Sequence, residues 1–497
     1  MGHAMNDMTR EMLISYDSHE TRVAIVEDRR LVELYIERPK RSVVGNIYLG
    51  KVKDVLPGMQ AAFVDIGLEK NSFLYVDEVV DPEGVSGAPR RDIQALLKPG
   101  QQLMVQVLKD PMGTKGARVT TEVTLPGRFL VLMPFSPFVG VSRKLEDEER
   151  ERLTSIVEPL VPEGLGVIVR TAAQGCTSAE IEGDLEFLVR LWKRVQAQSR
   201  EGVAPEVVYT EMDLALRMVR DAFSDEYRRL VVDDKRLFEK VSSFLTKTAP
   251  RLGKRVQLHK ERGGLFESYG LLADIDAAVR RTVALPSGGS ISIDRTEALT
   301  VVDVNTGSFV GRRSLEDTVA LTNLEAATEI VRQLRLRDIG GIIVIDFIDM
   351  EQAANRQLVL DRLASALDRD RTKTRLSEMS RLGLVEITRK NVTDGLYGTL
   401  TEPCPTCGGE GRVLSDATRR IAVERRLREI VTAGRSPAYL VGVDPTSYAL
   451  ITAPGRNAIA ALKAETGKRL SVIADPDCGP TEARVLIEGK TIADYPD

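Results

Sequence analysis

Two apolar runs that each end in an acidic residue constrain the fold of this chain more than any other feature. The first runs from Ala298 to Asp303 and continues to Asn305, and the second runs from Gly340 to Asp346. Short β-branched runs of this kind are typical of buried strands in an α/β sheet. Each strand would carry its carboxylate to the same edge of the sheet, where ligands bind in open α/β folds.

The segment between the two runs has the pattern of one amphipathic helix. Ser314 and Asp317 form a start like a capping box, and Gly340 can close the helix end. Apolar residues recur at helical spacing at Leu315, Val319, Leu324, Ala327, Val331 and Leu334. A strand–helix–strand unit is nearly always right-handed and places its two strands parallel in one sheet. We therefore expect Asp303 and Asp346 to be neighbours.

Two carboxylates with an asparagine beside the first offer only hard oxygen ligands, which suits Mg²⁺. We assign Asp303 and Asp346 as candidate magnesium ligands and catalytic residues, and Asn305 as the residue that orients water or phosphate. An acid at the end of one strand is more often a turn or cap residue, whereas a pair favours a metal site. One or two ions per chain fit this set, because Asp349 is a spare carboxylate.

The acidic runs and a later cysteine motif together resemble the catalytic core of the ribonuclease E/G endoribonucleases. The matching motifs are Val-Asp303-Val-Asn305-Thr-Gly, Gly-Gly-Ile-Ile-Val-Ile-Asp346-Phe-Ile-Asp-Met and Cys404-Pro-Thr-Cys407-Gly-Gly-Glu-Gly. The resemblance implies a Mg²⁺-dependent enzyme that cleaves single-stranded, A/U-rich RNA, acting on ribosomal RNA precursors and messenger RNA. Hydrolysis with an activated water would leave 5′-phosphate and 3′-hydroxyl ends.

The length of 497 residues exceeds one hydrophobic core and predicts three or four domains. The resemblance implies a finer division of an α/β multidomain chain. Its parts are a split RNase H-like subdomain at 1–40 and 216–278, an OB-fold (S1-type) RNA-binding barrel at 41–125, a 5′-phosphate sensor subdomain at 126–215, a DNase I-like α/β catalytic subdomain at 279–400, a zinc-link at 401–415 and a small α/β oligomerisation domain at 416–497. Met1–Ala4 is typical of an expression tag and is excluded from this division.

The composition is that of an ordinary globular protein, with 43% hydrophobic and 29% charged residues. No run approaches the ~18 to 20 apolar residues of a membrane span, and the N-terminus lacks a signal-peptide core. Four cysteines with one CxxC motif do not make a disulfide framework, so we expect a reducing cytoplasm. The net charge of −4 excludes RNA binding through overall positive charge and requires local basic patches.

Residues 45–124 alternate in short strands with turn signals, as expected for the five strands of an OB-fold. Such barrels bind single strands through exposed aromatic residues that stack and basic residues that contact the backbone. Phe63 and Phe73 are candidates for stacking, and Lys109 and Lys115 for backbone contact. A strand phenylalanine is more often a core residue, and periodicity alone favours the core. The resemblance favours RNA binding.

The strand that ends in Arg170 and Thr171 presents a guanidinium beside a hydroxyl, a pair that suits a terminal phosphate. An arginine at a strand end is more often a solvated surface residue, and the sequence leaves both interpretations open. The resemblance places Arg170 and Thr171 in a pocket that senses the 5′-monophosphate of RNA and stimulates cleavage, with Val131 as an apolar neighbour. Lys373 stands where members of the ribonuclease E type have an arginine.

Cys404 and Cys407 supply two of the four tetrahedral ligands of a structural zinc site. The other cysteines, Cys176 and Cys478, lie in unrelated segments. The simplest completion is a second copy of the motif from a symmetric partner, which gives one Zn²⁺ per two chains. The resemblance implies the same shared ion in a homodimer, with two such dimers able to form a tetramer. The alternative is a reduced CxxC turn that binds no metal.

Two other hypotheses remain open, one for the chemistry of RNA cleavage and one for the function of the chain. Histidine chemistry with attack by the 2′-hydroxyl would need His19 and His259 to meet in space. A non-catalytic, zinc-bearing RNA-binding or chaperone-like scaffold would explain the barrel and the cysteine motif, although the acidic pair favours the enzyme.

A later strand ends in Arg389 and Lys390, which are expected near the acids either as phosphate contacts or as a solvated edge.

Overall fold

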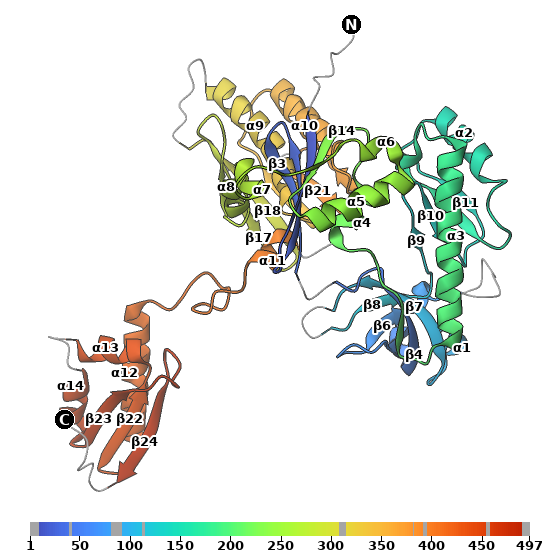
Figure 1. Cartoon of the computed structure of the whole chain (residues 1–497). Helices are drawn as coiled ribbons and strands as arrows, with labels where there is room; N and C mark the ends of the chain where they lie inside the picture. Colours follow the sequence, from blue (N-terminus) through green and yellow to red (C-terminus); the bar gives the residue numbers. More distant parts are fainter. Residues whose placement is uncertain are drawn as a thin grey trace. The chain divides into compact units, whose positions relative to one another are not determined.

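The computed structural model divides into two compact units, residues 1–401 and 402–497 (Figure 1). It describes residues 9–38, 42–80, 92–111, 115–307, 315–380, 382–390, 395–453 and 458–489. The proposed tag Met1–Ala4 and the expected helix-start residue Ser314 lie outside the described residues.

The first sheet of the larger unit joins strands from distant parts of the chain. β1 (Arg10–Tyr16), β2 (Thr21–Glu27) and β3 (Arg30–Glu37) are antiparallel neighbours, and β14 (Tyr227–Val232) and β15 (Val256–Leu258) extend the sheet in parallel from β1. We call this the split sheet. One face packs on α4 (Leu214–Asp221) and α5 (Lys235–Thr248), and the other packs on α7 (Leu265–Ser268) beside α8 (Leu272–Ala277).

A closed five-stranded barrel follows the split sheet, and it is consistent with the predicted OB-fold. Its strands are β4 (Ile47–Leu56), β5 (Ala61–Asp65), β6 (Ser72–Tyr75), β8 (Arg118–Thr120) and β7 (Gln102–Lys109), and β7 returns to pair with β4. The short elements η1 (Pro57–Met59), η2 (Val76–Glu78) and α1 (Ile93–Leu96) connect them. Alternating residues such as Val52, Val64 and Leu74 fill the barrel interior, which leaves the intervening side chains on its outer surface.

A four-stranded sheet packs beside the barrel. It consists of β9 (Leu125–Pro126), β10 (Leu130–Met133), β11 (Val139–Val141) and β12 (Gly166–Val169), with the helices α2 (Asp147–Val157) and α3 (Ser178–Glu201) and the turn η3 (Thr171–Ala173). β13 (Glu206–Tyr209) then pairs with β4 on the barrel. Thr177 and Glu180 form a capping box that begins α3, as expected from a threonine followed three residues later by a glutamate.

The acidic runs lie at the centre of a six-stranded sheet, which we call the acidic sheet. Its order is β16 (Thr282–Ala284), β17 (Ser290–Arg295), β18 (Leu299–Asn305), β19 (Gly341–Asp346), β21 (Leu384–Arg389) and β20 (Thr374–Leu376). The helices are α9 (Leu315–Leu336), α10 (Ala353–Leu367) and α11 (Gly395–Leu400). β18 and β19 are parallel and joined through α9, so the predicted strand–helix–strand unit is confirmed. The helix ends at Leu336 with Asp338 in the left-handed region (φ 50°), and Gly340 does not close it.

The acidic sheet is covered on one face only. α9 and α10 pack on the face that contains Val302, Ile343 and Ile345 (Figure 1). On the opposite face, which we call the open face, Ile342 is 49% exposed and Val344 is half-buried. The expectation of buried strands therefore holds for one face of the sheet and not for the other. β-Branched residues are common in half-buried strands as well, because they fit a pleated surface with one solvated side.

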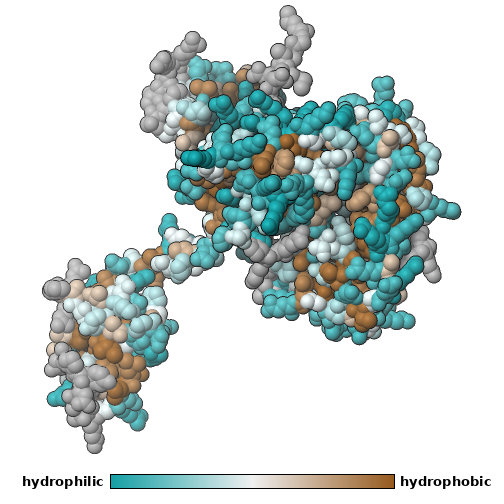
Figure 2. Space-filling model, viewed as in Figure 1, coloured by the Kyte–Doolittle hydropathy of each residue, from teal (hydrophilic) through white to brown (hydrophobic). Residues whose placement is uncertain are grey.

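The smaller unit is a three-stranded sheet with three helices. They are α12 (Asp416–Ala433), β22 (Ala438–Val443), α13 (Pro445–Thr452), α14 (Ala458–Thr466), β23 (Arg469–Ala474) and β24 (Ala483–Gly489), in the sheet order β23-β22-β24. Val485 and Ile487 of the edge strand β24 are exposed, and Figure 2 shows apolar side chains gathered on this unit. Across the described parts of both units, no helix has the length and apolar character needed to cross a membrane.

A buried ion network fixes the acidic sheet to the split sheet. Nη2 of Arg335, on α9, lies 2.8 Å from Glu27 Oε1 and 2.8 Å from Glu33 Oε1, and Arg371 also pairs with Glu33. Burial alone would raise the pKa of Glu33, but the charges of Arg371 and Arg335 outweigh it and lower this pKa to about 2. The two sheets are therefore held together by ionised groups that water does not screen.

Replacing Arg335 with methionine should lower the free energy of unfolding by about 3 to 5 kcal/mol, because two buried carboxylates lose their shared partner. The matched change Arg190→Met removes an exposed ion pair, in which Arg190 and Glu186 are 66% and 60% exposed, and should cost less than about 1 kcal/mol. Because the pKa of Glu33 is depressed, its contribution is present above pH 4.5 and is lost as the pH falls toward 2. Equal unfolding midpoints for the two variants would contradict this role.

Candidate functional site

The parallel register of β18 and β19 places the two predicted catalytic acids directly beside each other. Asp303 pairs with Asp346 across the strands, and both carboxylates are exposed on the open face. Asn305 lies on the same face, and its Nδ2 donates a hydrogen bond of 2.6 Å to Asp303 Oδ2. On the flanking strands, Ser292 pairs with Asp303 and Leu384 pairs with Asp346. The structure therefore brings together all three residues predicted for catalysis.

The donor set of this acidic pair fits Mg²⁺. Carboxylates and an amide are hard oxygen ligands, and Mg²⁺ typically takes one or two carboxylates and keeps several waters. Asp303 and Asp346 are open to solvent, so water and a phosphate oxygen can complete an octahedral shell. Within the described ranges, no group of three or more histidine, cysteine, aspartate or glutamate side chains surrounds one point. A site here would therefore depend on water and substrate for most of its ligands.

Two helix N-termini and one ion-paired arginine belong to the surroundings of the acidic pair. α9 follows β18 and α10 follows β19, so both helices begin on the side where the two catalytic strands end. Helix N-termini carry partial positive charge and attract phosphate groups. Arg281 pairs with Asp294 at 2.6 and 2.8 Å, which raises the pKa of Arg281, and its charge also interacts with Asp303. Because α9 carries Glu316 and Asp317 in its first turn and Arg281 is paired with Asp294, neutralising a phosphodiester here would depend on a bound cation.

The two basic residues that end β21 do not belong to this site. β21 runs antiparallel to β19, so Arg389 pairs with Gly341 at the far end of β19 and Leu384 pairs with Asp346. Arg389 is buried, and its guanidinium bonds Asp370 Oδ2 at 2.7 Å and Asp338 Oδ1 at 2.9 Å. The expectation that Arg389 and Lys390 lie near the acids is wrong, because the spacing of residues does not reveal the direction of a strand.

The predicted stacking residues form a pair on the outside of the barrel. Phe63 and Phe73 are cross-strand neighbours with ring centroids 6.0 Å apart in an edge-to-face arrangement. Both are half-buried and neither belongs to the interior cluster of the barrel. Lys109 and Lys115 are exposed. Arg118 on β8 lies opposite Phe73 on β6 and opposite Lys109 on β7 in the strand register. The sequence analysis did not name Arg118 as a candidate for RNA contact.

The predicted sensor residues cluster at the end of β12. Arg170 Nη1 donates to Gly127 O at 2.7 Å and to Asp221 Oδ1 at 2.7 Å, and its side chain remains 24% exposed. The hydroxyls of Thr171 and Ser142 are 2.9 Å apart. Val131 is half-buried on β10 and pairs with the residue two positions before Arg170. The cluster holds a guanidinium and hydroxyls at one exposed strand end.

The Asp221 carboxylate holds the Arg170 guanidinium in place, and Arg220 in turn holds Asp221. Burial raises the pKa of Asp221, but hydrogen bonds from Arg220 and the charge of Arg170 outweigh it, so the pKa is lowered. Arg220 binds both oxygens of Asp221 at 3.0 Å and also binds Glu211 at 3.0 Å. Asp221 was not predicted, because nothing in its local sequence indicates a contact with Arg170. Lys373, the other predicted basic contact, is exposed on the loop before β20.

The four cysteines lie in two kinds of local environment, exposed or partly exposed in the CxxC motif and buried elsewhere. Cys404 is exposed, and backbone amides of Cys407 and Thr406 donate to its sulfur, which lowers the pKa of this thiol. Gly411 N donates to Cys407 Sγ at 3.2 Å. Amide donors around a sulfur stabilise the thiolate form that binds metal. Cys176 and Cys478 are buried, so each is closed off inside its own core.

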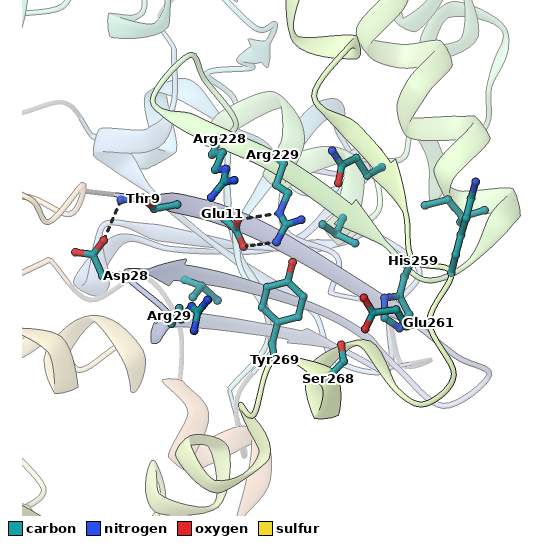
Figure 3. Close-up of a pocket in the computed structure, with 15 residues that line it drawn as sticks. Thr9, Glu11, Asp28, Arg29, Arg228, Arg229, His259, Glu261, Ser268 and Tyr269 are labelled. Carbon is teal, nitrogen blue, oxygen red and sulfur yellow. Dashed lines mark hydrogen bonds and ion pairs between the residues drawn. The ribbon is translucent and has the colours of Figure 1, made fainter. Parts of the chain in front are cut away.

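A separate cleft of about 820 Å³ lies on the split sheet beside α7 (Figure 3). Figure 3 shows Glu11 and Arg229 pointing toward each other near the middle of the cleft, where their side chains lie 2.8 Å apart, with Thr9 and Asp28 on one side and His259 on the other. His19 lies in the exposed turn between β1 and β2 and does not line this cleft. The acidic pair is also outside the cleft. Its place on an open face suits a polymer better than an enclosed small molecule.

Comparison with known proteins assigns the chain to a family. The model of the Ribonuclease E/G family matches residues 124–392, which include the acidic pair. Ribonuclease G of Escherichia coli (strain K12) is 42% identical over 477 residues, covering 94% of this chain and 98% of that protein. Ribonuclease G of Haemophilus influenzae is 41% identical, covering 93% and 96%.

Ribonuclease E of Haemophilus influenzae is 39% identical over 428 residues, covering 85% of this chain and 46% of that protein. The near-complete coverage of the ribonuclease G relatives agrees with the motif resemblance and excludes the non-catalytic scaffold. The chain belongs to the ribonuclease E/G family and is an endoribonuclease.

Proposed function

We propose that the chain hydrolyses single-stranded RNA at the acidic pair in a Mg²⁺-dependent reaction. The observation that carries this proposal is the register of Asp303 with Asp346 on the open face. A pair of adjacent exposed carboxylates has little structural purpose of its own, because like charges that face each other across strands are destabilising. The cost is offset when a cation lies between them.

Each side chain of the site would have a separate role in hydrolysis. Asp303 and Asp346 would hold Mg²⁺, and Asn305 keeps the Asp303 carboxylate oriented through its hydrogen bond. The ion, when bound, lowers the pKa of a coordinated water and neutralises charge on the phosphoryl oxygens. Attack by water breaks the bond between phosphorus and the 3′-oxygen, and the products carry a 5′-phosphate and a 3′-hydroxyl. The open face lets a continuous strand cross the site.

The barrel would hold the substrate strand. Phe63 and Phe73 present ring surface on the exterior, and Arg118, which also pairs with Glu78, and Lys109 follow on the adjoining strands. The exposed Lys115 is the second predicted backbone contact. Base stacking on aromatic rings is sequence-tolerant and works only for unpaired bases. We infer that the substrates are single-stranded, A/U-rich segments of ribosomal RNA precursors and messenger RNA, as the family resemblance implies.

The cluster at Arg170 would bind the 5′-monophosphate of the RNA. Arg170 retains guanidinium nitrogens beyond the one bound to Asp221, and Thr171 and Ser142 add hydroxyl donors. Charge-assisted hydrogen bonds to phosphate are roughly twice as strong as neutral ones, so a 5′-hydroxyl end would bind more weakly. Val131 would form the apolar wall of the pocket, and Lys373 would supply a point charge.

The zinc site and the assembly follow from the cysteine pair. Cys404 and Cys407 would each donate a thiolate to a Zn²⁺ that a second chain completes with the same two residues. The result is a homodimer with a closed twofold contact, and two such dimers could associate through the small unit. We place the enzyme in the cytoplasm, where thiols remain reduced.

Replacing either acid with asparagine tests the catalytic proposal. Asp303→Asn or Asp346→Asn should lower RNA cleavage by about 10²-fold or more, since each removes charge that stabilises the transition state. RNA affinity should stay within a few-fold, because the barrel is intact. Asp361→Asn, an exposed acid on α10 that bonds only Gln357, is the matched control. A variant of the pair that keeps more than about a tenth of wild-type activity at saturating Mg²⁺ would exclude this site.

Arg170→Ala should weaken the preference for 5′-monophosphorylated over 5′-hydroxyl RNA by about tenfold or more, since a bond to a charged group contributes ~1.5 to 3 kcal/mol. The cleavage position should not change. The control Arg190→Ala removes an exposed arginine from the same sheet-and-helix layer. Rates are compared on two otherwise identical oligonucleotides, and an unchanged ratio in the Arg170 variant would argue against phosphate sensing.

Metal analysis tests the shared site. Purified protein should contain about half a zinc per chain, because each chain supplies two of the four ligands. The double change Cys404→Ser and Cys407→Ser should lose the zinc and weaken the dimer in analytical ultracentrifugation. The control Cys176→Ser leaves the exposed motif untouched. One zinc per chain, or a double variant with wild-type zinc and assembly, would contradict a shared ion.

A further inference from the structure

The loop that follows the catalytic strand β19 is anchored by two side chains of α9. Asn323 bonds the backbone of Ile348, and Glu316 accepts hydrogen bonds from Glu351 N and Gln352 N, each at 3.1 Å. The loop leads directly from Asp346 to the start of α10. α9 therefore fixes the segment that begins at a catalytic carboxylate.

The contact made by Asn323 is a two-point bond to one backbone residue. Asn323 Nδ2 donates to Ile348 O at 2.8 Å, and Ile348 N donates to Asn323 Oδ1 at 3.1 Å. The Asn323 side chain is fully buried at 0% exposure. A carboxamide that donates to the carbonyl and accepts from the N–H of one residue fixes the position and orientation of that residue's backbone, as a neighbouring strand would.

This contact replaces strand pairing at the point where strand pairing ends. Asp346 is the last residue of β19 and the last to pair with β18 and β21. Phe347 is buried among the apolar residues beneath the sheet, and Ile348 is the next residue held by hydrogen bonds. Asp346 is therefore held by strand pairing before it and by Asn323 after it. Without the second anchor, its carboxylate would project from a free strand end.

We propose that Asn323 is a positioning residue for the Asp346 carboxylate and thereby for the divalent-cation site. The inference rests on the proposed function of the acidic pair. Asn323 does not touch the substrate or the ion, and it acts through the loop backbone. Mg²⁺ demands near-ideal octahedral geometry, so a ligand that can shift at a strand end binds it more weakly. Residues that orient metal ligands typically change metal affinity by about 10- to 100-fold when removed.

Asn323→Leu removes both hydrogen bonds and keeps the side-chain volume, and Asn323→Ser removes them without adding apolar bulk. The matched control is Thr322→Val, because Thr322 is equally buried on α9 and bonds only Thr318 O within the helix. Mg²⁺ binding to the full-length protein without RNA is measured by titration calorimetry. Both Asn323 variants should bind Mg²⁺ about tenfold or more weakly than the control. Cleavage should need correspondingly more Mg²⁺, with KM for RNA unchanged.

Thermal unfolding of the same proteins separates positioning from mere stability. If the Asn323 variants melt earlier but bind Mg²⁺ as the Thr322 variant does, Asn323 is only structural and the inference is overturned. Asp303→Asn, measured in parallel, shows which proposal fails. If Asp303→Asn binds Mg²⁺ like wild type, the metal site itself is misplaced. If Asp303→Asn loses Mg²⁺ and the Asn323 variants retain it, the role of Asn323 alone is wrong.

Discussion

The parallel pairing of β18 with β19 is the constraint on which the rest of the larger unit depends. Two adjacent parallel strands need a long crossover, and α9 supplies it by packing on one face of the acidic sheet. The other face is left open, and it carries Asp303 and Asp346. α9 also reaches the split sheet through Arg335 and the catalytic loop through Asn323. The crossover helix α9 thus contacts both the split sheet and the loop that follows Asp346.

Local sequence pattern was enough to predict the two acid-terminated strands of the site and the helix that connects them. An apolar run that ends in an acid identified Asp303 and Asp346, and the helical spacing between them predicted that they meet. Strand direction was not available from the same information, so Arg389 was placed at the wrong end of the sheet. In the sequence, Asn323 is one polar residue within a predicted helix, and nothing near it indicates a contact with Ile348. Its role depends on the loop that packs beneath it, which is a tertiary contact.

Charge explains why an acidic chain can still bind RNA. The net charge is −4, and some arginines are already paired with carboxylates inside the fold, among them Arg335 and Arg389. These groups hold sheets together and contribute little field at the surface. In the proposed function, exposed basic residues of the barrel would act locally instead, within about the 8 to 10 Å over which salt leaves a charge unscreened. In the proposed function, affinity would come from a short stretch of nucleotides stacked on aromatic rings, which would favour single strands over duplexes.

The arrangement around Arg170 shows how an ion pair can prepare a phosphate site. Asp221 holds one nitrogen of the guanidinium, and Arg220 holds Asp221 by both oxygens, so the arginine is oriented before any ligand arrives. Less side-chain freedom is lost on binding, and the free energy of the phosphate contact is retained as affinity. The negative charge of Asp221 also partly neutralises Arg170. A ligand with little negative charge would therefore be attracted only weakly, whereas a strongly anionic ligand would still bind. A 5′-monophosphate has that charge and a 5′-hydroxyl does not. In the proposed 5′-phosphate pocket, discrimination between the two ends would therefore depend on Asp221 as much as on Arg170.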